Sequence, residues 1–154
     1  MVLALLAACT PVTTRPDFRP DPRALVVILD ARPERVTTEL ATLVAAESLV
    51  VERVNIRDGY LESRWYDPPS HRSYRRDRDI GDLGAAVKVR CWADPYVPGQ
   101  TRLTIEAVYR PRYDPSRVER DLEVAVPKEH VGYGIAEHLF AKIKQKVGVP
   151  KTGS

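Results

Sequence analysis

Three histidines and two cysteines are the residues of this 154-residue chain that could carry catalytic or metal chemistry. His130 and His138 are eight residues apart, too far for the i, i+4 ligand pair of a helical zinc site. His71 stands alone in a polar stretch, and Cys9 and Cys91 lack the C-x-x-C spacing of a metal or redox site. No glycine-rich phosphate loop and no recognised triad pattern is present. The sequence therefore predicts no catalytic residues, no metal and no cofactor.

Cys9 is the cysteine with the more specific context. It ends the only strongly apolar N-terminal run, directly after Leu6-Ala7-Ala8. This start resembles the lipobox of bacterial lipoproteins, in which the cysteine is lipidated and becomes the new N-terminus. The resemblance implies that residues 1–8 are a signal-like segment and that Cys9 anchors the protein to a membrane. Thr10 in place of Asp then implies outer-membrane sorting, facing the periplasm. Eight residues are too few to span a bilayer as a helix. The alternative to a signal-like segment is a frayed apolar N-terminus.

Residues 9–23 contain four prolines, which fix φ and donate no backbone hydrogen bond. We expect the lipobox cysteine to be followed here by an extended, solvated tether. At about 3.1 Å per residue it would hold the domain about 40 Å from its anchor. The alternative is a disordered tail without a spacer role. The single folded domain is predicted to occupy residues 24–150.

A polar stretch over residues 67–83 holds the main cluster of arginines and is predicted to be a long loop. Arginine beside tyrosine suits phosphate groups, but Asp77 and Asp79 reduce the positive potential. A solvated loop, a loop ordered by a protein partner and an anionic-ligand site all remain open, in that order of preference. Aromatic side chains and arginine dominate interface energies. The candidate partner-binding residues are Arg72, Tyr74, Arg75, Arg76, Arg78, Trp92 and Tyr96.

Hydrophobic periodicity predicts the elements that position these residues. Helical spacing of apolar residues predicts amphipathic helices over 33–48 and 130–147. An apolar run predicts a buried strand over 24–29, and Asp58-Gly59 predicts a hairpin of strands 49–56 and 60–66. Alternation predicts a second hairpin of 85–93 and 101–109, then a strand over 118–126. Alternation in 60–66 indicates one wet face. Lys88, Arg90 and Trp92 lie opposite an apolar row containing Cys91, which we expect to be a small buried residue.

The element order β-α-β-β-β-β-β-α predicts an α+β domain, with an antiparallel sheet of about five to six strands packed by two helices in a helix-grip-like layout. Together with Leu6-Ala7-Ala8-Cys9 and the segment Gly59-Tyr60-Leu61-Glu62-Ser63-Arg64-Trp65, this order resembles the helix-grip domains of BamC-like outer-membrane lipoproteins. That family offers no catalytic residues to carry over.

These observations predict a non-enzymatic, lipid-anchored envelope protein. It would act as a scaffold or accessory subunit of a larger membrane-associated complex, with a protein partner. The alternative is a carrier that holds a lipid or another apolar ligand between sheet and helix. The formal charge of only +3 and the export signal argue against a nucleic-acid partner.

Overall fold

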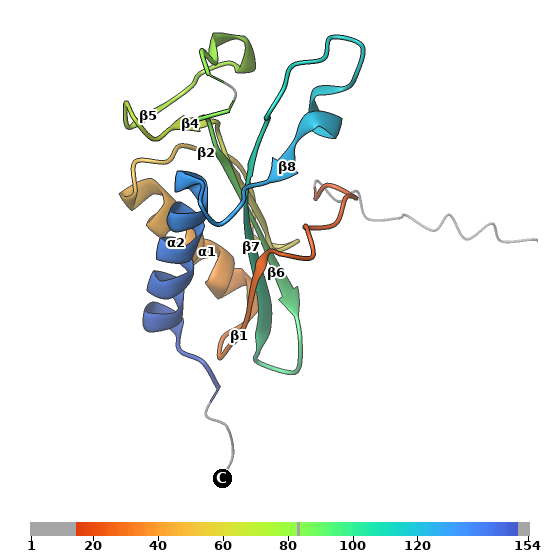
Figure 1. Cartoon of the computed structure of the whole chain (residues 1–154). Helices are drawn as coiled ribbons and strands as arrows, with labels where there is room; N and C mark the ends of the chain where they lie inside the picture. Colours follow the sequence, from red (N-terminus) through yellow and green to blue (C-terminus); the bar gives the residue numbers. More distant parts are fainter. Residues whose placement is uncertain (1–14, 83, 151–154) are drawn as a thin grey trace, which may run out of the picture.

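Six antiparallel strands and two helices make up the fold in the computed structural model, which describes residues 15–82 and 84–150 (Figure 1). This confirms the predicted α+β layout. The strand order is β1-β7-β6-β3-β2, with the short β8 beside β7, and a separate small hairpin is formed by β4 and β5. The elements are β1 Leu25–Leu29, α1 Pro33–Ala46, β2 Val51–Asn55, β3 Tyr60–Ser63, β4 Tyr66–Asp67, β5 Arg72–Ser73, η1 Asp77–Asp79, β6 Lys88–Pro95, β7 Thr101–Tyr109, η2 Glu119–Leu122, β8 Val124–Ala125 and α2 Val131–Val147.

Both helices lie on one face of the sheet, which we call the helix face (Figure 1). Pro33 begins α1, where its missing N–H costs nothing, and Val36, Leu40 and Val44 form its buried stripe. The imidazole of His130 accepts a hydrogen bond from the Gly132 N–H and so caps α2. Apolar residues of both helices and of alternate strand positions fill the space between helices and sheet.

Two glycines in the first turn of α2 have different roles. A Cβ on Gly132 would lie 2.5 Å from Val87 Cγ1, so this residue lets the helix approach the sheet closely. Gly134 differs, because its Cβ position has no atom within 4 Å and the residue faces away from the sheet.

The opposite face of the sheet, which we call the outer face, is buried over the central strands β3, β6 and β7. Register places Glu62 beside Arg90 and Arg90 beside Glu106 on three neighbouring strands. All three side chains are buried, and so is every residue of β3. The predicted wet face is therefore wrong. Two segments outside the sheet cover it, and these segments lie far from β3 and β6 in the sequence.

Residues 15–23 form one of these covers, which we call the strap. The strap crosses the outer face before the chain enters β1 (Figure 1). The predicted solvated tether is therefore wrong for residues 15–23, because Phe18 and backbone groups of the strap find partners on the sheet. Residues 9–14, including Cys9, lie outside the described residues.

The second cover is the β7–β8 connection, residues 110–123. The predicted strand over 118–126 is mostly wrong, since only Val124–Ala125 pair with β7 and the preceding turn is η2. The polar stretch over 67–83 also has more structure than predicted. It contains the β4–β5 hairpin and η1, and backbone hydrogen bonds between Tyr66 and Val87 tie it to the sheet.

Candidate functional site

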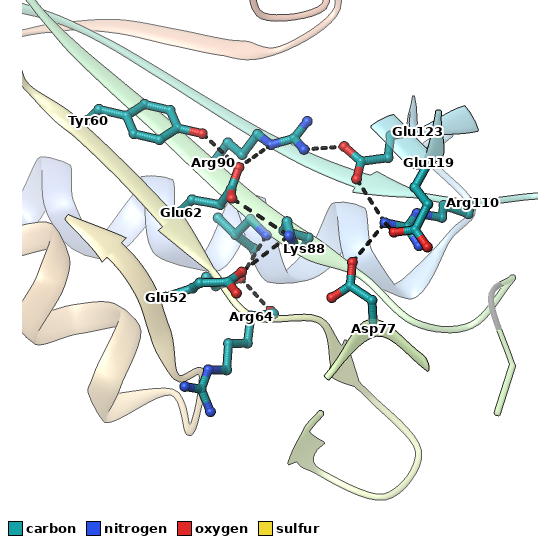
Figure 2. Close-up of polar contacts among 12 residues, drawn as sticks. Glu52, Tyr60, Glu62, Arg64, Asp77, Lys88, Arg90, Arg110, Glu119 and Glu123 are labelled. Atoms are coloured by element: carbon teal, nitrogen blue, oxygen red, sulfur yellow. Dashed lines mark hydrogen bonds and ion pairs between the residues drawn. The ribbon is translucent and has the colours of Figure 1, made fainter. Parts of the chain in front are cut away.

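A buried ionic cluster occupies the outer face of the sheet (Figure 2). It contains three acidic and three basic side chains, none more than 7% exposed. The two signs therefore balance, as buried charges require. The members are Glu62, Lys88, Arg90, Glu106, Arg110 and Glu123.

Arg90 lies at the centre of the ionic cluster and contacts all three of its carboxylates. Its Nε donates to Glu62 Oε2 at 2.8 Å, and its Nη2 donates to Glu123. Its Nη1 lies 3.7 Å from Glu106 Oε1. Glu62 also accepts a hydrogen bond of 2.8 Å from the Tyr60 hydroxyl. One guanidinium thus joins β3, β6, β7 and the β7–β8 connection.

Arg110 extends the cluster toward the 67–83 segment. Figure 2 shows Glu123 between the guanidinium groups of Arg90 and Arg110. Arg110 Nη2 lies 3.0 Å from Asp77 Oδ2 and 3.1 Å from Glu119 Oε2. Asp77 belongs to η1, so this ion pair fastens the arginine-rich segment to the outer face.

Trp65 fills the space between the two cationic ends of the cluster. The Arg110 guanidinium lies 4.6 Å from its ring centroid and Lys88 Nζ lies 5.2 Å from it. The indole is 1% exposed, and Ala86, Val108 and the half-buried Tyr74 and Ile80 pack around it. Cation–π contacts are strongest where water is excluded, so Trp65 adds to the cohesion of the cluster.

The pKa values of two carboxyl groups in the cluster are shifted in opposite directions. Burial opposes ionisation of Glu62, but the adjacent Lys88 and Arg90 outweigh it and lower the pKa of this carboxyl. Burial dominates at Glu106 and raises its pKa, because Arg90 is farther away and Asp21 is nearby. Burial and the Glu62 charge also raise the pKa of Tyr60. The cluster therefore prefers the charge on Glu62 to the charge on Glu106.

Asp21 and Phe18 attach the strap to the cluster and to residues beside it. The Asp21 N–H donates to Glu106 Oε2 at 2.8 Å. The Phe18 ring lies between two guanidinium groups, 4.8 Å from Arg90 and 4.4 Å from Arg120, and its edge meets Trp92.

Arg15 holds the strap at the end of β6. Its Nη1 forms an ion pair of 2.7 Å with Asp94 and donates to the Asp58 carbonyl at 3.2 Å. These contacts lie at the β6 end and in the β2–β3 turn, far along the sequence from the strap itself. The strap is thus fixed at both its beginning and its end.

The charges of the ionic cluster are paired with one another, and each has a partner of opposite sign within 4 Å. Cys91 is buried in the core beneath it, as predicted, and burial raises the pKa of its thiol. Within residues 15–82 and 84–150, no group of three histidine, cysteine or carboxylate side chains could hold a metal ion.

The predicted partner-binding residues divide into three groups. Arg72, Arg75, Arg76 and Arg78 are exposed, as an interaction surface requires, and Tyr96 is 53% exposed on the β6–β7 turn. Tyr74 is half-buried against Trp65. Trp92 is 1% exposed under Phe18, so its burial is incompatible with the predicted contact to a partner.

Sequence reasoning missed the ionic cluster and the strap. One signal was present: Tyr60 and Trp92 share the parity of Glu62, Lys88 and Arg90. Large aromatic side chains on a row of alternating charges indicate a covered surface rather than a solvated one. The identity of the cover could not be read from the strands.

A groove of about 600 Å³ opens between the end of α1, the start of α2 and the β4–β5 hairpin. Tyr66 and His71 line it and are joined by a 3.0 Å hydrogen bond between the hydroxyl and Nδ1. His71 and Ser48, at opposite rims, are the non-glycine residues with positive φ in the described part of the chain. Gly134 lies on the α2 side of the groove.

Comparison with protein-family models finds no family that matches the chain, and a search of curated proteins finds no similar sequence. Among the helices that the structure describes, none is both long and apolar enough to cross a membrane.

Proposed function

We propose that this protein is a non-enzymatic, lipid-anchored envelope protein that serves as a scaffold or accessory subunit of a membrane-associated complex. The anchor is the lipidated Cys9, and the sorting residue Thr10 favours the outer membrane, with the domain in the periplasm. The observation that supports this proposal most is the strap. The strap begins six residues after Cys9 and is fastened to the folded domain through the ionic cluster.

The strap gives the anchor a mechanical role. Six residue steps separate Cys9 from Arg15, and a fully extended chain spans at most about 3.6 Å per step. The anchor therefore lies within about 22 Å of Arg15, whose side chain is bound to Asp94. A domain held on so short a connection keeps one side toward the membrane and presents the other to partners.

The partner surface in this proposal is the segment Arg72–Arg78. Its four arginines are exposed, whereas Asp77 faces inward to Arg110 and fixes the segment on the fold. An arginine-rich surface on a fixed backbone suits an acidic protein surface, because little side-chain order is lost per contact formed. The matching partner is a protein with a carboxylate-rich face.

Fractionation tests the anchor. The wild-type protein is expected in the membrane fraction with an acylated Cys9, and the Cys9→Ser protein is expected in the soluble fraction. Intact-mass spectrometry reads the acyl group directly. Membrane association of the Cys9→Ser protein would contradict the proposed anchor.

Pull-down from solubilised membranes tests the partner surface. Replacing Arg72, Arg75, Arg76 and Arg78 by serine leaves Asp77 and its ion pair intact, so the fold is preserved. The matched control replaces four other exposed arginines, namely Arg32, Arg35, Arg57 and Arg102. The first variant is expected to lose its partner and the control to keep it. Equal recovery of the partner by both would remove the segment from the proposal.

A carrier function is the second candidate, and the groove favours it. Apolar side chains pack between the helices and the sheet, and the groove at the helix ends is half apolar and is bordered by Tyr66, His71 and His138. Gly134→Leu would fill it without touching the core, and Gly134→Ala is the matched control. Native mass spectrometry of the purified protein would show a bound lipid only in the wild type and the control.

A further inference from the structure

Strand β2 is the last strand at one end of the sheet. Within residues 15–82 and 84–150, no strand pairs with the side of β2 that faces away from β3, which we call the open edge. Three consecutive residues of β2 are exposed, namely Glu52, Arg53 and Val54. In β1, at the other end of the sheet, one residue is exposed, and directly after this strand the Asp30 N–H donates to the Gly148 carbonyl at 3.1 Å. β2 is therefore the more accessible of the two edge strands.

The backbone of β2 directs polar groups out of the open edge. The Arg64 N–H donates to the Val50 carbonyl at 2.8 Å, so this carbonyl faces β3. Backbone groups of successive residues in a strand point to opposite sides. The N–H and the carbonyl of Val51 therefore point away from β3. Unpaired groups of this kind are a template for the backbone of another extended chain.

Apolar side chains accompany these backbone groups. Val50, Val54 and Ile56 are between 44% and 45% exposed. None of the three belongs to the hydrophobic core of the domain. β-Branched side chains on neighbouring strands stabilise a sheet when they lie opposite one another. An added strand with apolar side chains would cover the three residues.

Three arginines gather around the beginning of β2. Arg53 lies on the strand, and Arg64 is bonded to Val50 through its backbone. Arg72 directly precedes Ser73, whose hydroxyl accepts a hydrogen bond of 3.2 Å from the Val50 N–H. The open edge is therefore continuous with the arginine-rich segment.

The charge along the beginning of the open edge is positive. None of the three arginines forms an ion pair with another residue of the described chain. Glu52 is the acidic residue of β2, and its carboxylate already lies 3.3 Å from Lys88 Nζ. A segment that pairs with β2 would therefore place its own side chains among unpaired guanidinium groups. Carboxylates suit that position.

We propose that the open edge of β2 binds an acidic, extended segment of a partner protein as an added β-strand. The backbone of that segment pairs with β2, its apolar side chains cover Val54, and its carboxylates contact Arg53 and Arg72. A second copy of this chain would bring the same arginines to the edge and would be repelled. This inference rests on the scaffold role of the proposed function and names the form of the partner segment.

NMR titration of the full-length Cys9→Ser protein with synthetic peptides tests the inference. The probe peptide alternates valine with glutamate, and the control peptide alternates valine with lysine. The probe is expected to shift the amide signals of β2, to slow hydrogen exchange of the Val51 amide and to leave β1 unchanged. The lysine peptide is expected to bind at least about tenfold more weakly. Equal affinity of the two peptides, or shifts at β1 in place of β2, would overturn the inference.

Two variants locate the contact on the open edge. Val54→Glu places a carboxylate there, and Val26→Glu is the matched control on β1, because Val26 is 53% exposed. Val54→Glu is expected to weaken binding of the probe peptide by about tenfold, and Val26→Glu is expected to leave it unchanged. Val51→Pro removes the outward N–H, which an edge strand tolerates, and is expected to abolish binding. Wild-type affinity of Val54→Glu and Val51→Pro would contradict the inference.

Pull-down from solubilised membranes separates this inference from the proposed function. A partner that the four-arginine variant loses and Val54→Glu retains would leave the scaffold role in place and overturn the strand contact. If the wild-type protein recovers no partner but the probe peptide protects the Val51 amide, the strand site stands and the scaffold role is wrong. A dimer that Val54→Glu dissociates would identify a second copy as the occupant and would also overturn the inference.

Discussion

Both faces of the sheet are buried over its central strands, but different interactions bury them. The helix face is closed by apolar side chains of α1 and α2, with Leu40 and Leu139 among its fully buried residues. The outer face is closed by Arg90 and its carboxylate partners beneath a strap and a loop. Apolar packing tolerates small displacements, whereas a buried ion pair depends on geometry and on the presence of each partner. The outer face is therefore the face that accepts only a covering segment whose polar groups match the buried charges.

Loss of Arg90 is expected to have the largest effect, because it leaves three carboxylates buried without their common partner. Arg90→Met should lower the free energy of unfolding by about 3–5 kcal/mol. Leu139→Ala on the helix face should cost about 2–5 kcal/mol through its cavity. Urea unfolding measures both. A loss below about 1 kcal/mol for Arg90→Met would show that the cluster is not buried as described.

Alanine substitutions at Gly132 and Gly134 test how closely α2 packs on the helix face. Gly132→Ala should destabilise the protein by about 1–3 kcal/mol, since its Cβ would overlap Val87. Gly134→Ala should stabilise it by about 0.5–1 kcal/mol, because alanine loses less backbone entropy in a helix. Thermal unfolding of the two variants in one buffer checks the prediction. Equal shifts of Tm would contradict the different surroundings of the two glycines.

The pH dependence of stability distinguishes two carboxylates of the outer face. The lowered pKa of Glu62 means that its charge stabilises the fold above its ordinary pKa, near 4.5, and that this stability is lost as pH falls through the lower, folded value. The raised pKa of Glu106 means that its charge destabilises the fold at neutral pH and that this penalty disappears below pH 4.5.

Glutamine substitutions test whether each charge stabilises or destabilises the fold. Glu62→Gln should destabilise the protein at pH 7 and do so less at low pH. Glu106→Gln should stabilise it at pH 7, since the amide oxygen can still accept the Asp21 N–H, and have little effect at low pH. Urea unfolding of both variants across pH 3–7 gives the comparison. If both substitutions changed the free energy of unfolding in the same direction at pH 7, the opposite pKa shifts of Glu62 and Glu106 would be refuted.

Phe18→Ala is expected to act on the strap and to leave the rest of the fold nearly unchanged. The half-buried ring adds two cation–π contacts and one edge contact, worth about 1–2 kcal/mol together. The expected result is release of the strap with the rest of the fold intact, read as red-shifted emission of Trp92. The exposed Tyr96→Ala is the control and should leave the emission of Trp92 unchanged.

The sequence predicted the helix face well and the outer face poorly. Thr101–Tyr109 was predicted with its observed bounds because its alternation is continuous and antiparallel pairing preserves it on both sides. Lys88, Arg90 and Glu62 have the same period, and charge on a strand usually indicates solvent. Their burial depends on residues 15–23 and 110–123, which are distant in sequence and have no periodic pattern.

The candidate site was predicted only in part, for a similar reason. The exposure of Arg72, Arg75, Arg76 and Arg78 follows from local composition, and the structure agrees. The burial of Trp92 does not follow from its strand, because the ring that covers it comes from Phe18, 74 residues earlier. Contacts of this kind are set by tertiary structure alone.

Hydrogen exchange at the strap tests the central claim most directly, namely that residues 15–23 are docked on the ionic cluster. The Asp21 amide, which donates to Glu106, is expected to exchange far more slowly than an unstructured amide, and Phe18→Ala is expected to restore fast exchange. NMR-detected exchange of the Cys9→Ser protein gives this rate. If the Asp21 amide of the protein with Phe18 intact exchanged at the rate of a free peptide, the segment would be a flexible tether, and this result would contradict the account.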